Sequence, residues 1–215
     1  MNDIKVCVFD WDGTLVDSEK HIVDSLTYAA KKLALPSLSY DVKKDIIGLS
    51  MQKALKTLYP VLSSADIEKM RTYYGEYFFS VPQDEKILFR HVVKTLTELK
   101  NNDYQLAVAT GKSRNGLDKA LVSTGLKQFF DIERCADETR SKPDPLMLSE
   151  IAAYYGINAA NMLMVGDTVF DLEMAKSFGS PSLGVSYGVH EVSRLGQHKP
   201  LGIIDCISEI HRYLD

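Results

Sequence analysis

Asp10 closes a short apolar run at residues 5–10, and a second carboxylate, Asp12, follows just before Gly13. The run is rich in β-branched and aromatic residues, which predicts a short buried strand. Burying a carboxylate is costly unless it is paired or bound to a metal. Two acids at the end of such a strand therefore indicate a cation between them. The alternative is that both acids only form a turn with Gly13, which is common at strand ends.

Polar and charged residues also follow the other predicted strands. Thr110 ends the second strand, Lys142 lies in the loop after the third, and Asp167 and Asp171 follow the fourth. Taken singly, these are ordinary strand-end, loop and helix-start residues. In a doubly wound parallel sheet, however, ligands bind outside the carboxyl ends of the strands. We therefore expect these four side chains to gather with Asp10 at one edge of the sheet.

This set of groups suits the binding of a phosphate and a metal. Carboxylates such as Asp10, Asp167 and Asp171 supply the hard oxygen ligands that Mg²⁺ prefers, and Mg²⁺ would draw in a phosphate. Thr110 and the amides at the start of the next helix can donate hydrogen bonds to phosphate oxygens. Lys142 can balance the charge of the carboxylates and the phosphoryl group.

The acid pair also supplies the groups needed for covalent phosphoryl transfer. A carboxylate such as Asp10 can attack phosphorus and form an aspartyl-phosphate. Asp12, two residues on, can protonate the leaving oxygen and then deprotonate the water that clears the intermediate. The sequence thus predicts hydrolysis of a phosphoester in two steps.

The elements that must position these groups follow two patterns. Apolar residues at helical spacing over 16–81 predict an all-helical insert, and from residue 87 helices alternate with strands. This predicts an α/β fold, a doubly wound, Rossmann-like parallel sheet with an inserted all-helical domain. We expect the core to span 1–15 and 82–215 and the insert to span 16–81. The predicted strands are 5–10, 104–109, 130–133, 162–165, 183–185 and 202–204, and the predicted core helices include 145–155, 168–178 and 207–214.

Composition narrows the class of protein. The chain has 215 residues, 45% of them hydrophobic, which suits one domain with a modest insertion. A net charge of -4 with no basic block argues against nucleic-acid binding. No apolar segment approaches the ~20 residues of a membrane span, and no signal peptide is predicted. The three cysteines form no C-x-x-C pair, so we expect neither a zinc site nor disulfides. These features predict a cytoplasmic protein with neither membrane nor nucleic-acid partners.

Four segments together resemble the four motifs of the haloacid-dehalogenase-like (HAD) hydrolases. The order and spacing of the motifs agree over nearly the whole chain. The helical insert is similar to the cap of the phosphoglycolate-phosphatase-like branch. Two short segments are also similar to that branch, namely Leu15-Val16-Asp17-Ser18 and Ile47-Gly48-Leu49-Ser50. The four segments are Asp10-Trp11-Asp12-Gly13-Thr14, the strand that ends in Thr110, Lys142 in Lys-Pro-Asp-Pro, and Gly166-Asp167-Thr168-Val169-Phe170-Asp171.

The resemblance implies a role for each of these residues. Asp10 would be the nucleophile, and Asp12 the general acid and base. Thr110 and Lys142 would bind and stabilise the phosphoryl group. The cofactor would be Mg²⁺, held by Asp10, the backbone carbonyl of Asp12 and Asp167, with Asp171 as a ligand through water or as a support.

The resemblance also implies a small phosphorylated metabolite as substrate, with 2-phosphoglycolate as the first guess. The cap would close over the substrate and set specificity, as lids generally do. The oligomeric state stays open between monomer and dimer. The expected substrate-binding residues are Gly48, Leu49 and Ser50 in the cap, and Thr110, Gly111, Lys112 and Arg114 in the core.

Other activities of similar proteins fit less well. Dehalogenases typically lack an acid at the position of Asp12, so its presence favours phosphoryl transfer. Sugar phosphomutases are an alternative, but their cap histidine is expected where Ile22 stands, and His21 is one residue away. A non-enzymatic phospho-receiver is a second alternative, although the helical insert and Asp12 are not expected of it. One departure from the family pattern is Leu88-Phe89-Arg90-His91, which stands where relatives often have a Phe-Pro-Gly turn.

Overall fold

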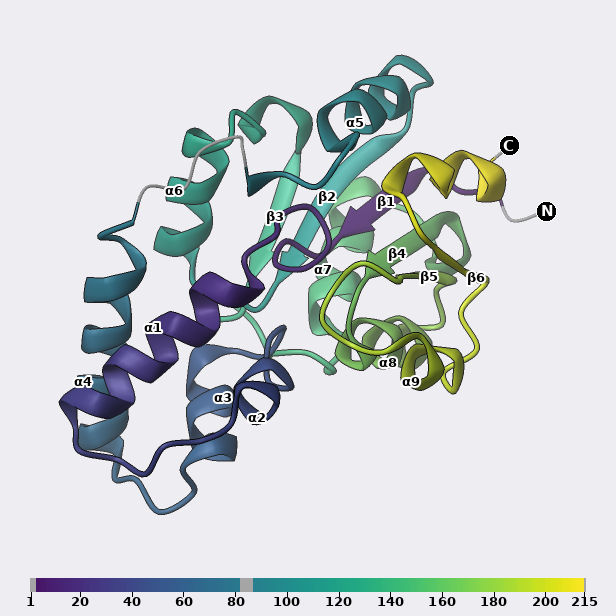
Figure 1. Cartoon of the computed structure of the whole chain (residues 1–215). Helices are drawn as coiled ribbons and strands as arrows, with labels where there is room; N and C mark the ends of the chain where they lie inside the picture. The colour runs from purple at the N-terminus through teal and green to yellow at the C-terminus, as the bar shows by residue number, and fades with distance from the viewer. Residues whose placement is uncertain (1–2, 82–86, 215) are drawn as a thin grey trace.

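The computed structural model describes residues 3–81 and 87–214. Its centre is one six-stranded parallel sheet in the order β3-β2-β1-β4-β5-β6 (Figure 1). The strand order reverses between β1 and β4, and such a point leaves a crevice outside the carboxyl ends of the strands. The predicted doubly wound α/β fold is confirmed. The strands span Val6–Phe9 (β1), Gln105–Thr110 (β2), Ile132–Cys135 (β3), Met162–Gly166 (β4), Ser182–Val185 (β5) and Gly202–Ile204 (β6).

Helices flank the sheet and also form a separate helical unit, which we call the cap (Figure 1). In the part of the chain that the structure describes, no helix is both long and apolar enough to cross a membrane. The cap contains α1 (Glu19–Lys32), α2 (Tyr40–Lys44), α3 (Met51–Leu58) and α4 (Ser64–Phe78). The core contains α5 (Val92–Asn101), α6 (Arg114–Ser123), α7 (Leu146–Tyr155), α8 (Val169–Phe178), α9 (Val192–Gly196) and the 3₁₀ helices η2 (Lys127–Phe129), η3 (Ala159–Asn161) and η4 (Ile207–Tyr213).

Both faces of the sheet are buried. Successive side chains of a strand point to opposite faces, so Val8 packs in one cluster with Met147 of α7, and Phe9 in another with Leu96 of α5. Because helices cover both faces, the central strands are continuously apolar rather than alternating. Complete burial of a side chain such as Phe9 contributes about 2 kcal/mol to folding.

The cap has an apolar core of its own. Ile22 and Leu26, one helical turn apart on α1, pack in one cluster with Met70 of α4. Ser50 and Ser63 cap α3 and α4, since each hydroxyl accepts a hydrogen bond from the backbone amide three residues further on. The helical spacing predicted over 16–81 is thus present in these helices.

Short elements differ from the prediction. Helices α2 and α9 contain only five residues each and lie outside the predicted elements, because so short a run shows no helical repeat. The tail predicted as a helix over 207–214 is the 3₁₀ helix η4, which ends at Tyr213. Its buried residues, Ile207 and Ile210, are three apart, which matches the three residues per turn of a 3₁₀ helix.

The chain passes from core to cap after a short bridged segment. Leu15 and Val16 are buried in the core cluster, and Val16 forms bridges with Asp12 and Leu88. Val16 thus packs with the core, although the predicted insert starts at that residue. The domain division stays a prediction, and its second boundary, before Pro82, falls at residues outside those described.

Candidate active site

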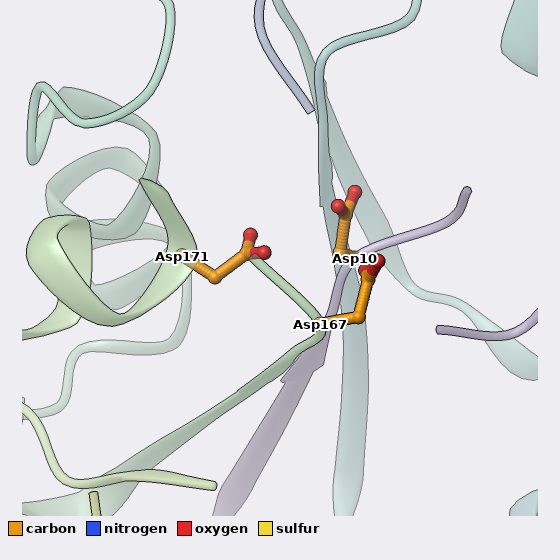
Figure 2. A group of neighbouring side chains, drawn as sticks. All are labelled: Asp10, Asp167 and Asp171. Carbon is orange, nitrogen blue, oxygen red and sulfur yellow. The ribbon is translucent and has the colours of Figure 1, made fainter. Parts of the chain in front are cut away.

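Three buried carboxylates meet beyond the carboxyl ends of β1 and β4. One carboxylate oxygen from each of Asp10, Asp167 and Asp171 lies within 4.8 Å of the others (Figure 2). We call these residues the acid triad. The register that pairs Phe9 with Val165 brings Asp10 and Asp167 to neighbouring strand ends. Asp171 projects toward them from the first turn of α8.

Lys142 ties two members of the acid triad together. Its Nζ lies 2.8 Å from Asp10 Oδ1 and 2.6 Å from Asp171 Oδ1, and its side chain is fully buried. Asp10 Oδ1 also accepts a hydrogen bond of 2.6 Å from the Trp11 amide. Asp10 Oδ2, by contrast, is buried without a hydrogen-bond partner among the described residues. One oxygen of the Asp10 carboxylate is therefore left for a ligand.

The charges at this site do not balance, because one ammonium faces three buried carboxylates. Burial raises the pKa of Asp10, and Asp171 and Asp167 raise it further against the opposing effect of Lys142. Burial raises the pKa of Asp167 to about 7, with the charge of Asp171 as the next cause. Burial alone would lower the pKa of Lys142, but its two carboxylate partners keep that pKa raised. A bound cation would relieve this excess of negative charge.

Backbone and hydroxyl donors hold Asp167 in place. Thr14 Oγ1 donates to Asp167 Oδ1, and the Val189 amide donates to Oδ2, each at 2.8 Å. Glycines allow this close approach: a Cβ at Gly13 would lie 2.1 Å from Asp167 Oδ2, and one at Gly188 would lie 2.2 Å from Asp167 Cβ. Both glycines are therefore required by the crowding around this carboxylate.

The start of α8 orients Asp171. Its Oδ2 accepts hydrogen bonds from the Thr168 amide at 3.1 Å and from Thr168 Oγ1 at 2.8 Å, which forms part of a capping box. Asp171 Oδ1 is left to face Lys142. The same residue thus caps a helix and completes the acid triad.

Sequence reasoning did not place His190 beside the site. His190 is buried, and its Nδ1 accepts a hydrogen bond of 3.0 Å from the Val169 amide at the start of α8. Its Nε2 lies 3.3 Å from the carbonyl oxygen of Asp45 in the cap, and Arg194 pairs with the Asp45 carboxylate. Burial lowers the pKa of His190, with Arg194 as the next cause. No signal in the sequence links these residues, because they meet only through tertiary packing.

The Asp12 carboxylate has its partners outside the acid triad. Its Oδ1 accepts a hydrogen bond of 2.6 Å from Ser18 Oγ, and Lys112 Nζ lies 3.0 Å from the same oxygen. Lys112 also lies over the ring of Phe78, 4.8 Å from its centroid. The predicted metal role of Asp12 concerns its backbone carbonyl and stays a prediction.

The loop after β2 meets the cap closely. Thr110 is buried, and its hydroxyl accepts a hydrogen bond of 3.2 Å from the Lys112 amide. A Cβ at Gly111 would lie 2.6 Å from the carbonyl oxygens of both Gly48 and Leu49. A side chain at Gly111 would therefore force the cap away from the core.

A second contact joins the cap to the loop that carries Lys142. The Ser50 amide donates a hydrogen bond of 2.8 Å to Ser141 Oγ, and Lys53 Nζ donates one of 3.2 Å to the Lys142 carbonyl oxygen. Sequence reasoning did not find Ser141 or Lys53. The only indication in the sequence that Ser141 lies near the site is its position directly before Lys142 in the Lys-Pro-Asp-Pro segment.

A cavity of about 380 Å³ lies between cap and core. No residue of the acid triad lines this cavity. Of the two acids that follow β1, Asp12 lines the cavity and Asp10 does not. Tyr74 and Phe78 of α4 contribute part of the wall. The predicted residues that line the cavity are Asp12, Gly48, Leu49, Ser50, Gly111 and Lys112.

Arg114, like Thr110, does not line this cavity, unlike the other residues predicted to bind substrate. Its guanidinium pairs with Glu138 at 2.8 Å, and with Glu133 and Asp118 at 3.3 Å. The Glu138 carboxylate in particular raises the pKa of Arg114. Arg114 begins α6, and these three acids hold its side chain away from the cavity.

Comparisons with known proteins agree with this geometry. The model of the family described as haloacid dehalogenase-like hydrolase matches residues 7–185. Probable phosphatase IndB from Dickeya dadantii is 35% identical over 207 residues, covering 94% of this chain and 90% of that protein. A phosphoglycolate phosphatase from Vibrio cholerae is 29% identical, covering 98% of this chain and 96% of its own. The crystal structure of a predicted phosphoglycolate phosphatase from Haemophilus somnus has a TM-score of 0.85 at 27% identity, with 99% of both chains covered.

The fold and the acid triad define an α/β hydrolytic enzyme with a cap. This chain belongs to the haloacid dehalogenase-like hydrolases. The family resemblance predicted from the four motifs is confirmed.

Proposed function

We propose that this enzyme is a Mg²⁺-dependent phosphatase that hydrolyses a small phosphomonoester through an aspartyl-phosphate on Asp10. The observation that carries the proposal is the environment of Asp10. Its carboxylate is buried beside Lys142, its Oδ2 has no hydrogen-bond partner among residues 3–81 and 87–214, and an acid that lines the cavity follows two residues later. The names of the relatives, which are phosphatases, support the same reaction.

The residues present fit Mg²⁺. Three carboxylates and one unpartnered buried oxygen form a hard, anionic donor set. Asp10, Asp167 and the Asp12 carbonyl would hold the ion, with Asp171 as a ligand through water or a support. When bound, Mg²⁺ supplies charge neutralisation at the carboxylates and at the phosphoryl oxygens.

Each residue of the site has its own role in the two chemical steps. Asp10 attacks phosphorus, a new O–P bond forms, and the bond from phosphorus to the leaving oxygen breaks. Asp12 gives its proton to that oxygen and then takes one from the water that attacks the phosphorylated Asp10. Lys142 and the Thr110 hydroxyl hold the phosphoryl oxygens during both steps. The products are the free alcohol and inorganic phosphate, and Asp10 is regenerated.

The structure around α1 favours a phosphatase over a mutase. Ile22 lines the cavity, whereas His21 does not. The His21 ring packs against the Phe78 ring at a tilt of 42°, with centroids 4.5 Å apart, and its Nε2 lies 2.9 Å from the Phe78 carbonyl oxygen. A histidine held in this way is not available to shuttle protons over the phosphoester.

The test is hydrolysis of 4-nitrophenyl phosphate by the wild type with Mg²⁺, by the wild type with EDTA, and by Asp10→Asn with Mg²⁺. We expect turnover only in the first case. Asp17→Asn is the matched control, because Asp17 is an exposed carboxylate next to the same motif. Turnover that persists in both EDTA and Asp10→Asn would refute the mechanism. A phosphorylated Asp10 that outlasts the assay without turnover would instead indicate a phospho-receiver.

A further inference from the structure

We infer that the natural substrate is a phosphomonoester whose leaving group is an uncharged, ring-bearing alcohol, and that the Tyr74 hydroxyl positions this alcohol. The inference rests on the proposed phosphatase function and adds the substrate class. The cavity volume of about 380 Å³ lies within the range of about 300–1,000 Å³ of pockets that hold drug-sized ligands. A two-carbon leaving group such as glycolate would leave most of this space unfilled.

The charges that line the cavity argue against an anionic leaving group. Its two cations are already paired: Lys112 Nζ lies 3.0 Å from Asp12, and Arg71 Nη1 lies 3.1 Å from Glu68. A third acid, Asp137, also lines the cavity, so acids outnumber cations among the described lining residues. A carboxylate on the leaving group would lose its hydration here and face three acids against two cations, each of which lies beside an acid. An uncharged alcohol meets no such penalty.

The walls of the cavity suit a ring. Tyr74 and Phe78 lie one turn apart on α4, with ring centroids 5.4 Å apart and an interplanar angle of 18°. Ile22 and Leu26 contribute an apolar wall from α1, and α1 lies beside α4 in the cap (Figure 1). Apolar contact with stacked aromatic rings favours a leaving group that has an apolar or aromatic face.

Tyr74 also presents a polar atom. Its hydroxyl makes no hydrogen bond with any described residue, although its side chain lines the cavity. Burial raises the pKa of Tyr74, and the charge of Asp12 adds to this effect, so the phenol stays protonated close to Asp12. A neutral hydroxyl in this position can bond to a hydroxyl of the alcohol that Asp12 protonates.

The experiment compares kcat/KM in Mg²⁺ for ribose 5-phosphate, uridine 5′-monophosphate, 2-phosphoglycolate and 4-nitrophenyl phosphate. We expect at least one of the two ring-bearing metabolites to exceed 2-phosphoglycolate by tenfold or more. The two metabolites separate a sugar from a nucleoside as the source of the ring. Glu68→Gln, which frees Arg71 and removes a negative charge, is expected to raise kcat/KM for 2-phosphoglycolate relative to the better ring-bearing metabolite.

Tyr74→Phe tests the hydroxyl while keeping the aromatic ring. We expect KM for the better ring-bearing metabolite to rise about three- to tenfold, the effect of one hydrogen bond, with kcat nearly unchanged. KM for 4-nitrophenyl phosphate, whose leaving group has no second hydroxyl, is expected to stay the same. Tyr73→Phe is the matched control, because Tyr73 lies on the same helix but does not line the cavity.

The outcomes separate the two proposals. If 4-nitrophenyl phosphate is hydrolysed but 2-phosphoglycolate equals or exceeds both ring-bearing metabolites, the substrate class is wrong and the phosphatase function stands. If Tyr74→Phe raises KM for 4-nitrophenyl phosphate as much as for the metabolite, the positioning role of the hydroxyl is overturned. If the wild type hydrolyses none of the four compounds, the phosphatase function fails and this inference fails with it.

Discussion

Lys142 and Asp10 form an ion pair of 2.8 Å in which both side chains are almost completely buried. The lysine comes from the loop after β3, and the aspartate from the end of β1. Removing one partner of a buried pair is costly because the other charge stays buried without compensation. Lys142 is therefore expected to matter for stability as well as for turnover.

We predict that Lys142→Met lowers the free energy of unfolding in EDTA by about 3–5 kcal/mol at neutral pH. Turnover of 4-nitrophenyl phosphate should fall at least about 100-fold, since a positioned cation is lost at the phosphoryl site. Urea unfolding and steady-state kinetics measure the two effects. Lys176→Met, at an exposed lysine of α8, should change stability by less than about 0.5 kcal/mol. Equal stability of the two variants would contradict the prediction.

The raised pKa of Asp167 predicts how stability depends on pH without metal. Between its unfolded pKa near 3.8 and its folded pKa of about 7, the folded state holds a proton that the unfolded state has lost. Folding stability in EDTA should therefore be greatest below this window and fall as the pH rises through it, by an amount on the order of a few kcal/mol.

Urea unfolding in EDTA at pH 5 and pH 7.5 tests this dependence. Asp167→Asn should show a smaller decline than the wild type, because the neutral amide cannot lose a proton. Mg²⁺ should stabilise the wild type more at pH 7.5 than at pH 5, since the ion binds the ionised carboxylates. Identical pH profiles for the wild type and Asp167→Asn in EDTA would show that Asp167 does not titrate in this way.

The close approach of Gly111 to the cap predicts an effect on closure. In Gly111→Ala the new Cβ would meet the carbonyl oxygens of Gly48 and Leu49 at 2.6 Å, so the cap must move away. We expect kcat/KM to fall at least about tenfold, because lid closure completes such sites. Gly196→Ala is the control, since a Cβ at Gly196 meets nothing within 4 Å. Wild-type turnover by Gly111→Ala would show that this contact is not required.

The backbone at His91 predicts a stabilising substitution. His91 precedes α5 in the left-handed region, with φ 69° and ψ 2°, and its side chain is exposed and makes no capping bond. A non-glycine residue there is strained by roughly 1–2 kcal/mol. Glycine relieves this strain but loses more backbone entropy on folding. The net effect of His91→Gly should be a rise in the free energy of unfolding of about 0.5–1 kcal/mol. His91→Ala, which keeps a Cβ, should show no gain, and equal stability of the two variants would contradict the explanation.

Local patterns determined the fold class and the acid triad. An apolar run that ends in Asp10 or Asp167 predicts a buried strand with a polar end, and parallel strands place such ends at one edge. Helical spacing likewise predicted α1, α3 and α4 of the cap. These features depend on neighbours in the chain, so the sequence alone could show them.

Only the tertiary structure decided how the site is completed between distant segments. The contact of Ser50 with Ser141 and that of His190 with Val169 join residues 91 and 21 positions apart. Arg114 pairs with Glu133 and Glu138 instead of lining the cavity, because packing at the start of α6 brings these acids beside it. Side-chain partners across cap and core follow from how the two units pack together, and the order of residues along the chain does not encode that packing in any local pattern.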